Sequence, residues 1–136
     1  MTASPVVALR KAIRARLLMD GALVAALGGA RIYEEAPRGA ETPYVLFTDA
    51  EMRDWSTTLS RGSEHFLTLA VISTERGLGP ALDVAQQIVD LLDSAALTLD
   101  DHELIDLRFA SMNTKRDASG RFARVAMLFR ATTEYL

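Results

Sequence analysis

The chain has 136 residues, 49% of them hydrophobic, and a formal net charge of −3. This length is typical of one domain with its own core, so we expect a single domain over residues 1–136. The negative charge argues against a cationic nucleic-acid-binding protein, and the lack of cysteine excludes disulfides and thiolate metal sites. No apolar run reaches the ~20 residues that span a bilayer, so no membrane partner is expected.

The first third of the chain predicts two helices. Ser4 suits an N-cap and Pro5 suits the first helical turn, and apolar residues then recur at spacings of three and four as far as Leu17. Asp20 is expected to cap a second, short helix over residues 22–27, which two glycines end. Residues 30–33 are compatible with a short edge strand.

Residues 64–99 organise the rest of the predicted fold. Residues 65–72 are mostly apolar and partly β-branched, which is typical of a strand buried on both faces. Pro80 favours the start of a helix, and the apolar residues that follow as far as Ala96 fall on one broad face at helical period. A strand followed by such a helix indicates a sheet covered by helices.

Three more strands are predicted from apolar patterning. Residues 43–48 form the first, with an extension through Met52 left open. Residues 104–109 alternate at period two, and residues 122–133 form the last strand. Two polar hairpin tips, residues 53–62 and 115–121, connect strands; Asp117 suits the start of the second turn and Gly120 a positive φ.

The predicted fold class is therefore α+β, with the element order α-α-β-β-α-β-β. We expect a four-stranded, mainly antiparallel sheet with helices packed on one face. The expected core is Val45 or Phe47, with Leu69, Val71, Leu82, Val89, Leu92, Ile105, Leu107, Val125, Met127 and Phe129.

The sequence holds no strong catalytic or ligand-binding motif. The acidic run at residues 100–103 lacks a spaced second set of ligands and is expected to be a solvated connection. Residues 77–80 precede a helix but lack a nucleotide-binding fingerprint. His65 and His102 are expected to be exposed, and neither lies in a nucleophile elbow. We therefore expect no enzyme activity, no cofactor and no metal.

The candidate functional residues are instead residues for interaction with other proteins. The first helix carries only basic charges before Asp20, whereas the helix after Pro80 carries only acidic ones. The basic side could pair with an acidic patch of a neighbouring copy, bind phosphate or anionic lipid, or simply be solvated. An exposed Trp in a polar tip is typical of interfaces, although it could also pack under its own loop. The candidates are Arg10, Lys11, Arg14, Arg53, Trp55, Arg116 and Arg121.

The order and spacing of several short motifs carry a resemblance that covers nearly the whole chain. The motifs are Leu17-Leu18-Met19-Asp20, the segment from Leu23 to Gly29, Arg31-Ile32-Tyr33, Pro37, Pro43-Tyr44, Asp54-Trp55-Ser56-Thr57, Leu69-Ala70-Val71-Ile72-Ser73, Leu97-Thr98-Leu99, Leu107-Arg108-Phe109 and the turn from Asp117 to Gly120. In this order the chain resembles the small tail-completion proteins of long-tailed phages, prophages and gene transfer agents. Ile72 departs from the aromatic residue expected there in many relatives.

Members of that family are similar to tail terminators, which sets further expectations. The resemblance implies a structural virion protein that forms a homo-oligomeric ring, with six copies expected, on the head-proximal end of the tail tube. Its partners would be the tail tube protein and the head-side stopper or connector, with DNA passing through the lumen without sequence-specific binding. The protein would be in the bacterial cytoplasm during assembly and then in the virion. The alternatives are another head–tail joining protein, or a small nucleic-acid-binding or ligand-binding domain.

Overall fold

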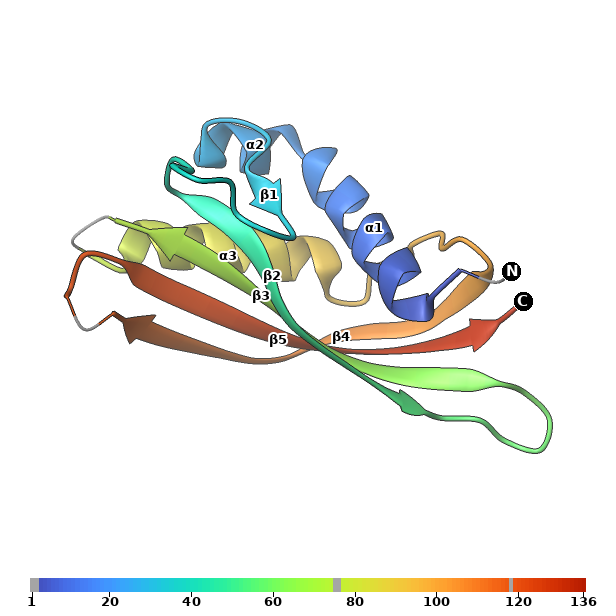
Figure 1. The fold of residues 1–136 in the computed structure, drawn as a ribbon. Helices are drawn as coiled ribbons and strands as arrows, with labels where there is room; N and C mark the ends of the chain where they lie inside the picture. The colour runs from blue at the N-terminus through green and yellow to red at the C-terminus, as the bar shows by residue number, and fades with distance from the viewer. Residues whose placement is uncertain (1–2, 75–76, 118) are drawn as a thin grey trace.

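The computed structural model describes residues 3–74, 77–117 and 119–136, in which three helices lie on one face of a five-stranded sheet (Figure 1). Along the chain the elements are α1 (Pro5–Leu18), α2 (Gly21–Leu27), β1 (Ile32–Tyr33), β2 (Tyr44–Asp54), β3 (Gly62–Ser73), α3 (Gly79–Leu92), β4 (His102–Arg116) and β5 (Ala123–Tyr135).

The sheet has the strand order β1-β2-β3-β5-β4. The three pairs among β2, β3, β5 and β4 are antiparallel, whereas β1 pairs with β2 in parallel, Ile32 lying opposite Val45. The α+β class and the helices on one face are as predicted, but the sheet is five-stranded and mixed rather than four-stranded. The additional strand is the short edge segment that the sequence left open.

The helix boundaries follow from local capping chemistry, as predicted. The Ser4 hydroxyl accepts a hydrogen bond from the Val7 amide at 3.4 Å, and Pro5 occupies the first position of α1. The Asp20 carboxylate accepts from the Leu23 amide at 3.0 Å and caps α2. Gly28 ends α2 in the left-handed region, with φ of 81°, where a residue without Cβ is favoured.

The core lies between the inner face of the sheet and the helices. On β3 and β5 alternate side chains turn inward, and α3 packs against both strands. Ten of the expected core residues are buried, while Leu82 is only partly buried. The ten are Val45, Phe47, Leu69, Val71, Val89, Leu92, Leu107, Val125, Met127 and Phe129.

The assignment of Ile105 to the core is wrong. Its side chain is 46% exposed, because β4 has a bulge at this position. Leu104 lies opposite Thr133 and Asp106 lies opposite Thr132, which leaves Ile105 without a cross-strand partner. The extra residue turns Leu104 and Leu107 toward the core, whereas an uninterrupted period of two would have turned Ile105 inward.

The expectation of exposed histidines is also wrong, since His65 and His102 are each only 2% exposed. The His65 Nε2 atom lies 3.0 Å from the Thr133 hydroxyl. The His102 Nε2 atom lies 2.7 Å from the Ala3 carbonyl, and its ring meets Tyr135 edge-on at 4.7 Å. Burial, together with the smaller effect of nearby His102, lowers the pKa of His65 from 6.5 to about 4. His65 is therefore neutral at pH 7.

We expect Leu92→Ala to lower the free energy of unfolding by about 2–5 kcal/mol, because the fully buried side chain would leave a cavity. Chemical denaturation measures this loss. Leu82→Ala, on the same helix but only partly buried, is the matched control and should cost less. Equal losses for the two variants would contradict the burial difference.

The free energy of unfolding should also fall as the pH is lowered from about 6.5 to about 4. The unfolded chain takes up a proton at His65 near pH 6.5, whereas the folded chain does so only near pH 4, so acid favours the unfolded state. The expected contribution is on the order of 2–3 kcal/mol. It is measured as the pH-dependent difference between the wild type and His65→Gln in chemical denaturation. Parallel pH profiles for the two proteins would exclude this contribution.

Candidate interaction surfaces

The described residues contain no group of three or more His, Asp or Glu side chains placed to hold a metal ion. In the acidic run, Asp101 accepts a hydrogen bond from the Ala3 amide at 2.9 Å, and its backbone has φ of 62°. Together with His102, it anchors the segment before α1. This connection is thus partly structural and not simply solvated. No helix in the described ranges is both long and apolar enough to cross a membrane.

The basic side of α1 already has partners within the chain. The Arg10 guanidinium lies 5.5 Å from the centre of the Phe47 ring, and the Arg14 Nε donates to the Ile32 carbonyl at 3.0 Å. The Lys11 ammonium pairs with Asp100 at 2.9 Å, and both side chains are well exposed. An exposed pair of this kind contributes ~0–1 kcal/mol, so it can be exchanged for a partner's carboxylate at little cost.

The acidic side of α3 is exposed at Asp83, Asp90 and Asp93. Asp90 accepts a hydrogen bond from the Gln86 amide at 2.8 Å, and Asp93 accepts one from the Phe109 backbone N–H at 3.0 Å. In the described part of the chain, none of these three carboxylates forms an ion pair with Lys or Arg. The sign separation seen in the sequence is therefore present on the folded surface.

The connection between β2 and β3, residues 55–61, extends beyond the body of the domain and is called the arm below (Figure 1). Its backbone is held by internal hydrogen bonds, from Trp55 N–H to the Gly62 carbonyl and from Thr57 N–H to the Ser60 carbonyl. A Cβ on Gly62 would lie 2.9 Å from the Thr133 carbonyl oxygen, so only glycine fits the base of the arm. At the tip of the arm, the Leu59 side chain is 95% exposed.

Trp55 and Arg53 lie at the base of the arm, on the strand side. Trp55 is 46% exposed, and the Arg130 guanidinium lies 5.9 Å from its ring centre while pairing with Glu64 at 2.7 Å. Arg53 pairs with Glu51 at 3.0 Å and lies over the Phe66 ring at 5.4 Å. Trp55 thus has both a packing partner within the chain and an exposed portion available to another molecule.

The connection between β4 and β5 forms the other predicted tip, although Ala118 lies outside the described residues. Gly120 has φ of 71°, and Asp117 starts the turn, both as predicted. Hydrogen bonds from the Ser119 hydroxyl and the Phe122 N–H hold the pKa of the Asp117 carboxyl below its ordinary value. Arg121 is exposed, and Arg116 lines a hollow at this end of the sheet.

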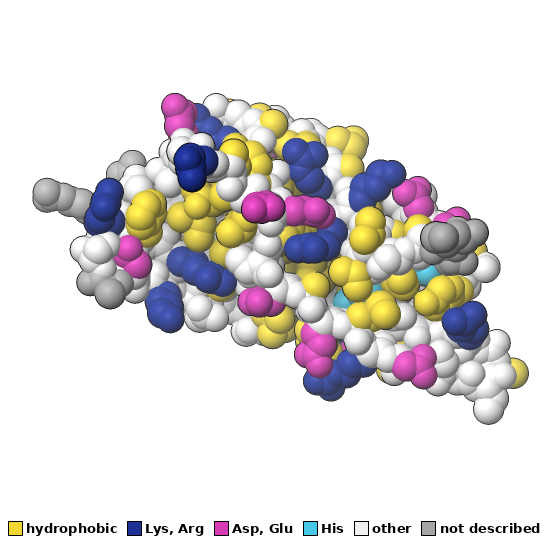
Figure 2. Space-filling model, in the orientation of Figure 1, with side chains coloured by type: hydrophobic (Ala, Val, Ile, Leu, Met, Phe, Trp, Pro, Cys, Tyr) yellow, Lys and Arg dark blue, Asp and Glu magenta, His cyan; other side chains and the backbone are white. Residues whose placement is uncertain are grey.

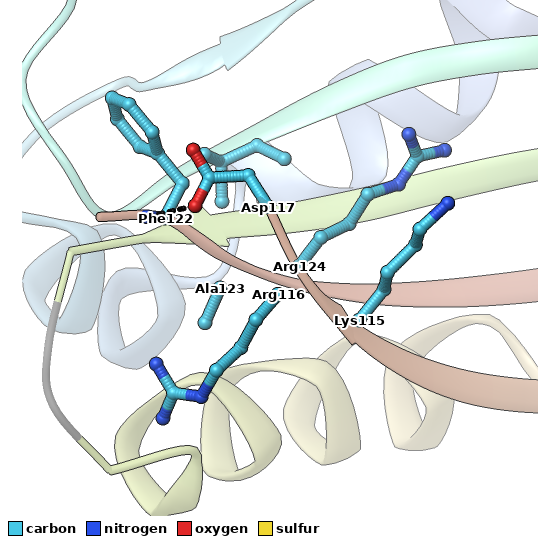
Figure 3. A pocket seen from close by; sticks show the side chains of 7 residues that line it. Lys115, Arg116, Asp117, Phe122, Ala123 and Arg124 are labelled. Atoms are coloured by element: carbon cyan, nitrogen blue, oxygen red, sulfur yellow. Dashed lines mark hydrogen bonds between the residues drawn. The ribbon is translucent and has the colours of Figure 1, made fainter. Parts of the chain in front are cut away.

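This hollow measures about 490 Å³ and is the feature shown in Figure 3. The Lys115 and Arg124 side chains extend in the same direction from neighbouring strands, whereas Arg116 points the other way (Figure 3). The residues that line the hollow are Ile72, Lys115, Arg116, Asp117, Phe122, Ala123 and Arg124. The Lys115 and Arg124 cations thus lie on one side of an apolar floor, and the Asp117 carboxylate also lines the hollow.

Sequence reasoning missed the sheet face opposite the helices. Half-buried apolar side chains occupy it, including Leu46, Phe66, Ile72 and Leu128. Their strands carry charged side chains on the same face, and Figure 2 shows acidic, basic and hydrophobic groups interspersed over the side in view. The alternation of β3 and β5 contained this signal, but the strongly apolar sequence of β3 suggested burial on both faces. Leu59 was also missed, although it is an apolar residue within a polar tip.

The comparisons with known proteins agree with this fold. The model of the family described as "Tail completion protein gp17" matches residues 11–134. A chain of the solved structure titled "Virion of native gene transfer agent (GTA) particle" is 28% identical, with a TM-score of 0.89. That match covers 98% of this chain and 99% of the other. A search of curated proteins finds no significant match. Since the family model spans most of the sequence, the chain belongs to the tail completion protein gp17 family, which confirms the resemblance to phage and gene-transfer-agent tail-completion proteins.

Proposed function

We propose that this protein is a tail terminator, a structural virion protein that forms a ring on the head-proximal end of a tail tube. The observation that carries the proposal is the family match over residues 11–134, supported by the close structural similarity to a chain of a gene transfer agent virion. The ring would contain six copies, stop polymerisation of the tube and join it to the head-side connector. In this role the protein acts by assembly, with no catalysis and no cofactor.

The distribution of surfaces supports a ring. Copies in a ring contact one another head to tail, so that one patch meets a different patch of the next copy. The chain offers such distinct patches in the basic side of α1, the acidic side of α3, the arm and the hollow at the β4–β5 end. In a two-fold dimer, by contrast, the same patch of both copies would meet.

The charge of the protein suits a passage for DNA that does not retain it. Affinity for duplex DNA depends mainly on Lys and Arg that neutralise phosphates, and this chain has a net charge of −3. Acidic side chains lie among the basic ones on the side shown in Figure 2. We propose that DNA crosses the lumen without sequence-specific binding. The protein would assemble in the bacterial cytoplasm and then form part of the head–tail joint of the particle.

Native mass and electron micrographs of the purified protein, alone and with its tube protein, test the role directly. A closed ring that caps tubes at one end and limits their growth supports a terminator. A ring bound to the head side alone would indicate a stopper or adaptor instead. A protein that remains a monomer at high concentration, and that tube protein does not recruit into rings, would contradict the proposal.

We further expect part of the subunit contact to be electrostatic, with the Arg10, Lys11 and Arg14 side of α1 facing an acidic patch next door. Arg10→Glu/Arg14→Glu should then shift sedimentation toward smaller species, and so should high salt, because exposed ion pairs are screened. Such pairs contribute ~0–1 kcal/mol each, so they would determine the register of the contact rather than its strength. Buried apolar residues would supply most of the binding free energy, with Trp55 as a candidate anchor.

The matched control is Arg16→Glu/Arg38→Glu, which makes the same change in net charge at other positions. Thermal melting of both variants is needed, since Arg10 and Arg14 also make contacts within the chain. If the oligomer is insensitive to salt and to the Arg10→Glu/Arg14→Glu substitutions, the proposed electrostatic contribution to the contact is wrong, while the proposal of a ring still stands.

A further inference from the structure

We propose that neighbouring copies join through opposite ends of the same β4–β5 ladder, the acidic end and arm of one copy seating on the basic hollow of the next. This inference rests on the proposed ring and specifies its subunit contact. It starts from two like-charge pairs on the face of the sheet opposite the helices. Lys115 lies directly opposite Arg124 at one end of the ladder, and Glu103 lies directly opposite Glu134 at the other.

Like charges that face each other across a strand pair are destabilising, so each normally needs a compensating partner. A third pair shows the usual solution: Arg108 lies opposite Arg130, but Arg108 pairs with Asp106 at 2.9 Å and Arg130 with Glu64 at 2.7 Å. Lys115 and Arg124 form no ion pair with any residue that the structure describes.

The carboxylates at the acidic end of the ladder also lack ion-pair partners in the described part of the chain. Over the described ranges, neither Glu103 nor Glu134 pairs with a Lys or Arg. Glu134 accepts a hydrogen bond from the neutral Ser60 hydroxyl, at 3.3 Å. Asp54, which lines a hollow together with Glu134, likewise accepts from the Ser56 hydroxyl. Of the nearby cations, Arg53 pairs with Glu51 and Arg61 lies 4.6 Å over the Tyr135 ring. Among the described residues, this end therefore carries three carboxylates, Glu103, Glu134 and Asp54, that lack an ion-pair partner.

The two ends are too far apart to neutralise each other within one chain. Arg124 and Glu134 are ten residues apart on a single strand, a separation on the order of 30 Å at ~3.3 Å per residue. Figure 1 shows the arm and the β4–β5 connection at opposite extremities of the molecule. Two complementary patches at opposite ends of one subunit are what a head-to-tail contact requires. A second copy of the chain is therefore the occupant that satisfies both patches.

Apolar shape complements the charge. The floor of the basic hollow includes Ile72, paired with Arg124 in the sheet, and Phe122, which is 40% exposed. The arm presents Leu59 at 95% exposure on a loop that its own hydrogen bonds hold in place. A preformed apolar tip loses little conformational freedom on docking. In the assembled contact, Leu59 enters the hollow while Glu103, Glu134 and Asp54 face Lys115 and Arg124.

Charge-reversed variants test the contact. Lys115→Glu/Arg124→Glu makes both ends acidic, and Glu103→Lys/Glu134→Lys makes both ends basic. Each variant alone should lose the ring in sedimentation and micrographs, taken with tube protein if the wild type needs it. Mixed in equal amounts, the two variants should regain particles of wild-type mass, because acidic and basic copies can alternate around a ring of six. This recovery also shows that both variants fold.

Arg16→Glu/Arg38→Glu, with the same change in net charge as the first variant, should keep the ring. Leu59→Ser should weaken assembly, whereas Met19→Ser, at a side chain 79% exposed on another surface, should not. If the wild type forms rings and either reversed variant alone also forms intact rings, this contact is overturned and the terminator role stands. The same conclusion holds if the two reversed variants stay monomeric when mixed. A wild type that forms no ring under any of these conditions would overturn both proposals.

Discussion

The uninterrupted pairing of β3 with β5 is the constraint on which the rest of the structure depends. It runs from Gly62 opposite Glu134 to Ser73 opposite Ala123 without a shift in register. Because side chains alternate strictly along both strands, this ladder defines the inner face that α3 covers and the opposite face that the helices leave open. The flanking strands adapt to it: β2 and β4 contain the bulges, while the central pair contains none.

Along the same ladder, the buried side chains change from apolar to polar. Where α3 lies on the sheet, the inward positions are apolar, as at Leu69, Val71 and Met127. Toward the arm they become His65 and Thr133, whose side chains hydrogen-bond to each other, and neighbouring His102 binds the Ala3 carbonyl. Most buried polar groups find such partners, although the buried His102 Nδ1 atom has none among the described residues. The polar end of the core therefore holds the segment before α1 in place by specific contacts.

Much of the fold was predictable from the sequence because its determinants are local. The caps at Ser4 and Asp20, the glycine after α2 and the apolar face of α3 are fixed by residues a few positions apart. The burial of the histidines was not predictable, since it depends on Thr133 and Ala3, which are distant in the sequence. The prediction that Ile105 is buried was wrong because a bulge depends on the partner strand as well as on the residues that form it.

For the candidate interaction surfaces, too, local features were predictable from the sequence and features that depend on distant residues were not. The sequence identified basic and acidic helices and the exposed Trp55, since charge and residue type are visible directly. It did not show that Lys115 would lie opposite Arg124, or Glu103 opposite Glu134, because register relates residues up to 31 positions apart. Nor did it show that Lys11 would pair with Asp100 across the fold. Interaction chemistry that depends on pairing becomes visible only when the strands have been aligned.

The bulges of β4 have a consequence beyond the orientation of Ile105. β4 is a terminal strand of the sheet and extends from His102 to Arg116. Residues 93–98 cover part of its outer edge, since Thr98 bridges Glu103 and the Ser94 N–H donates to the Leu107 carbonyl at 2.8 Å, whereas the part beyond Phe109 offers backbone groups to which a foreign strand could add. Register shifts at two places break the regular spacing of those groups, and Asp106, Arg108 and Lys115 place charges along the strand. Natural sheets use both devices to prevent indiscriminate edge-to-edge aggregation. The open part of this edge is thereby kept from recruiting strands at random.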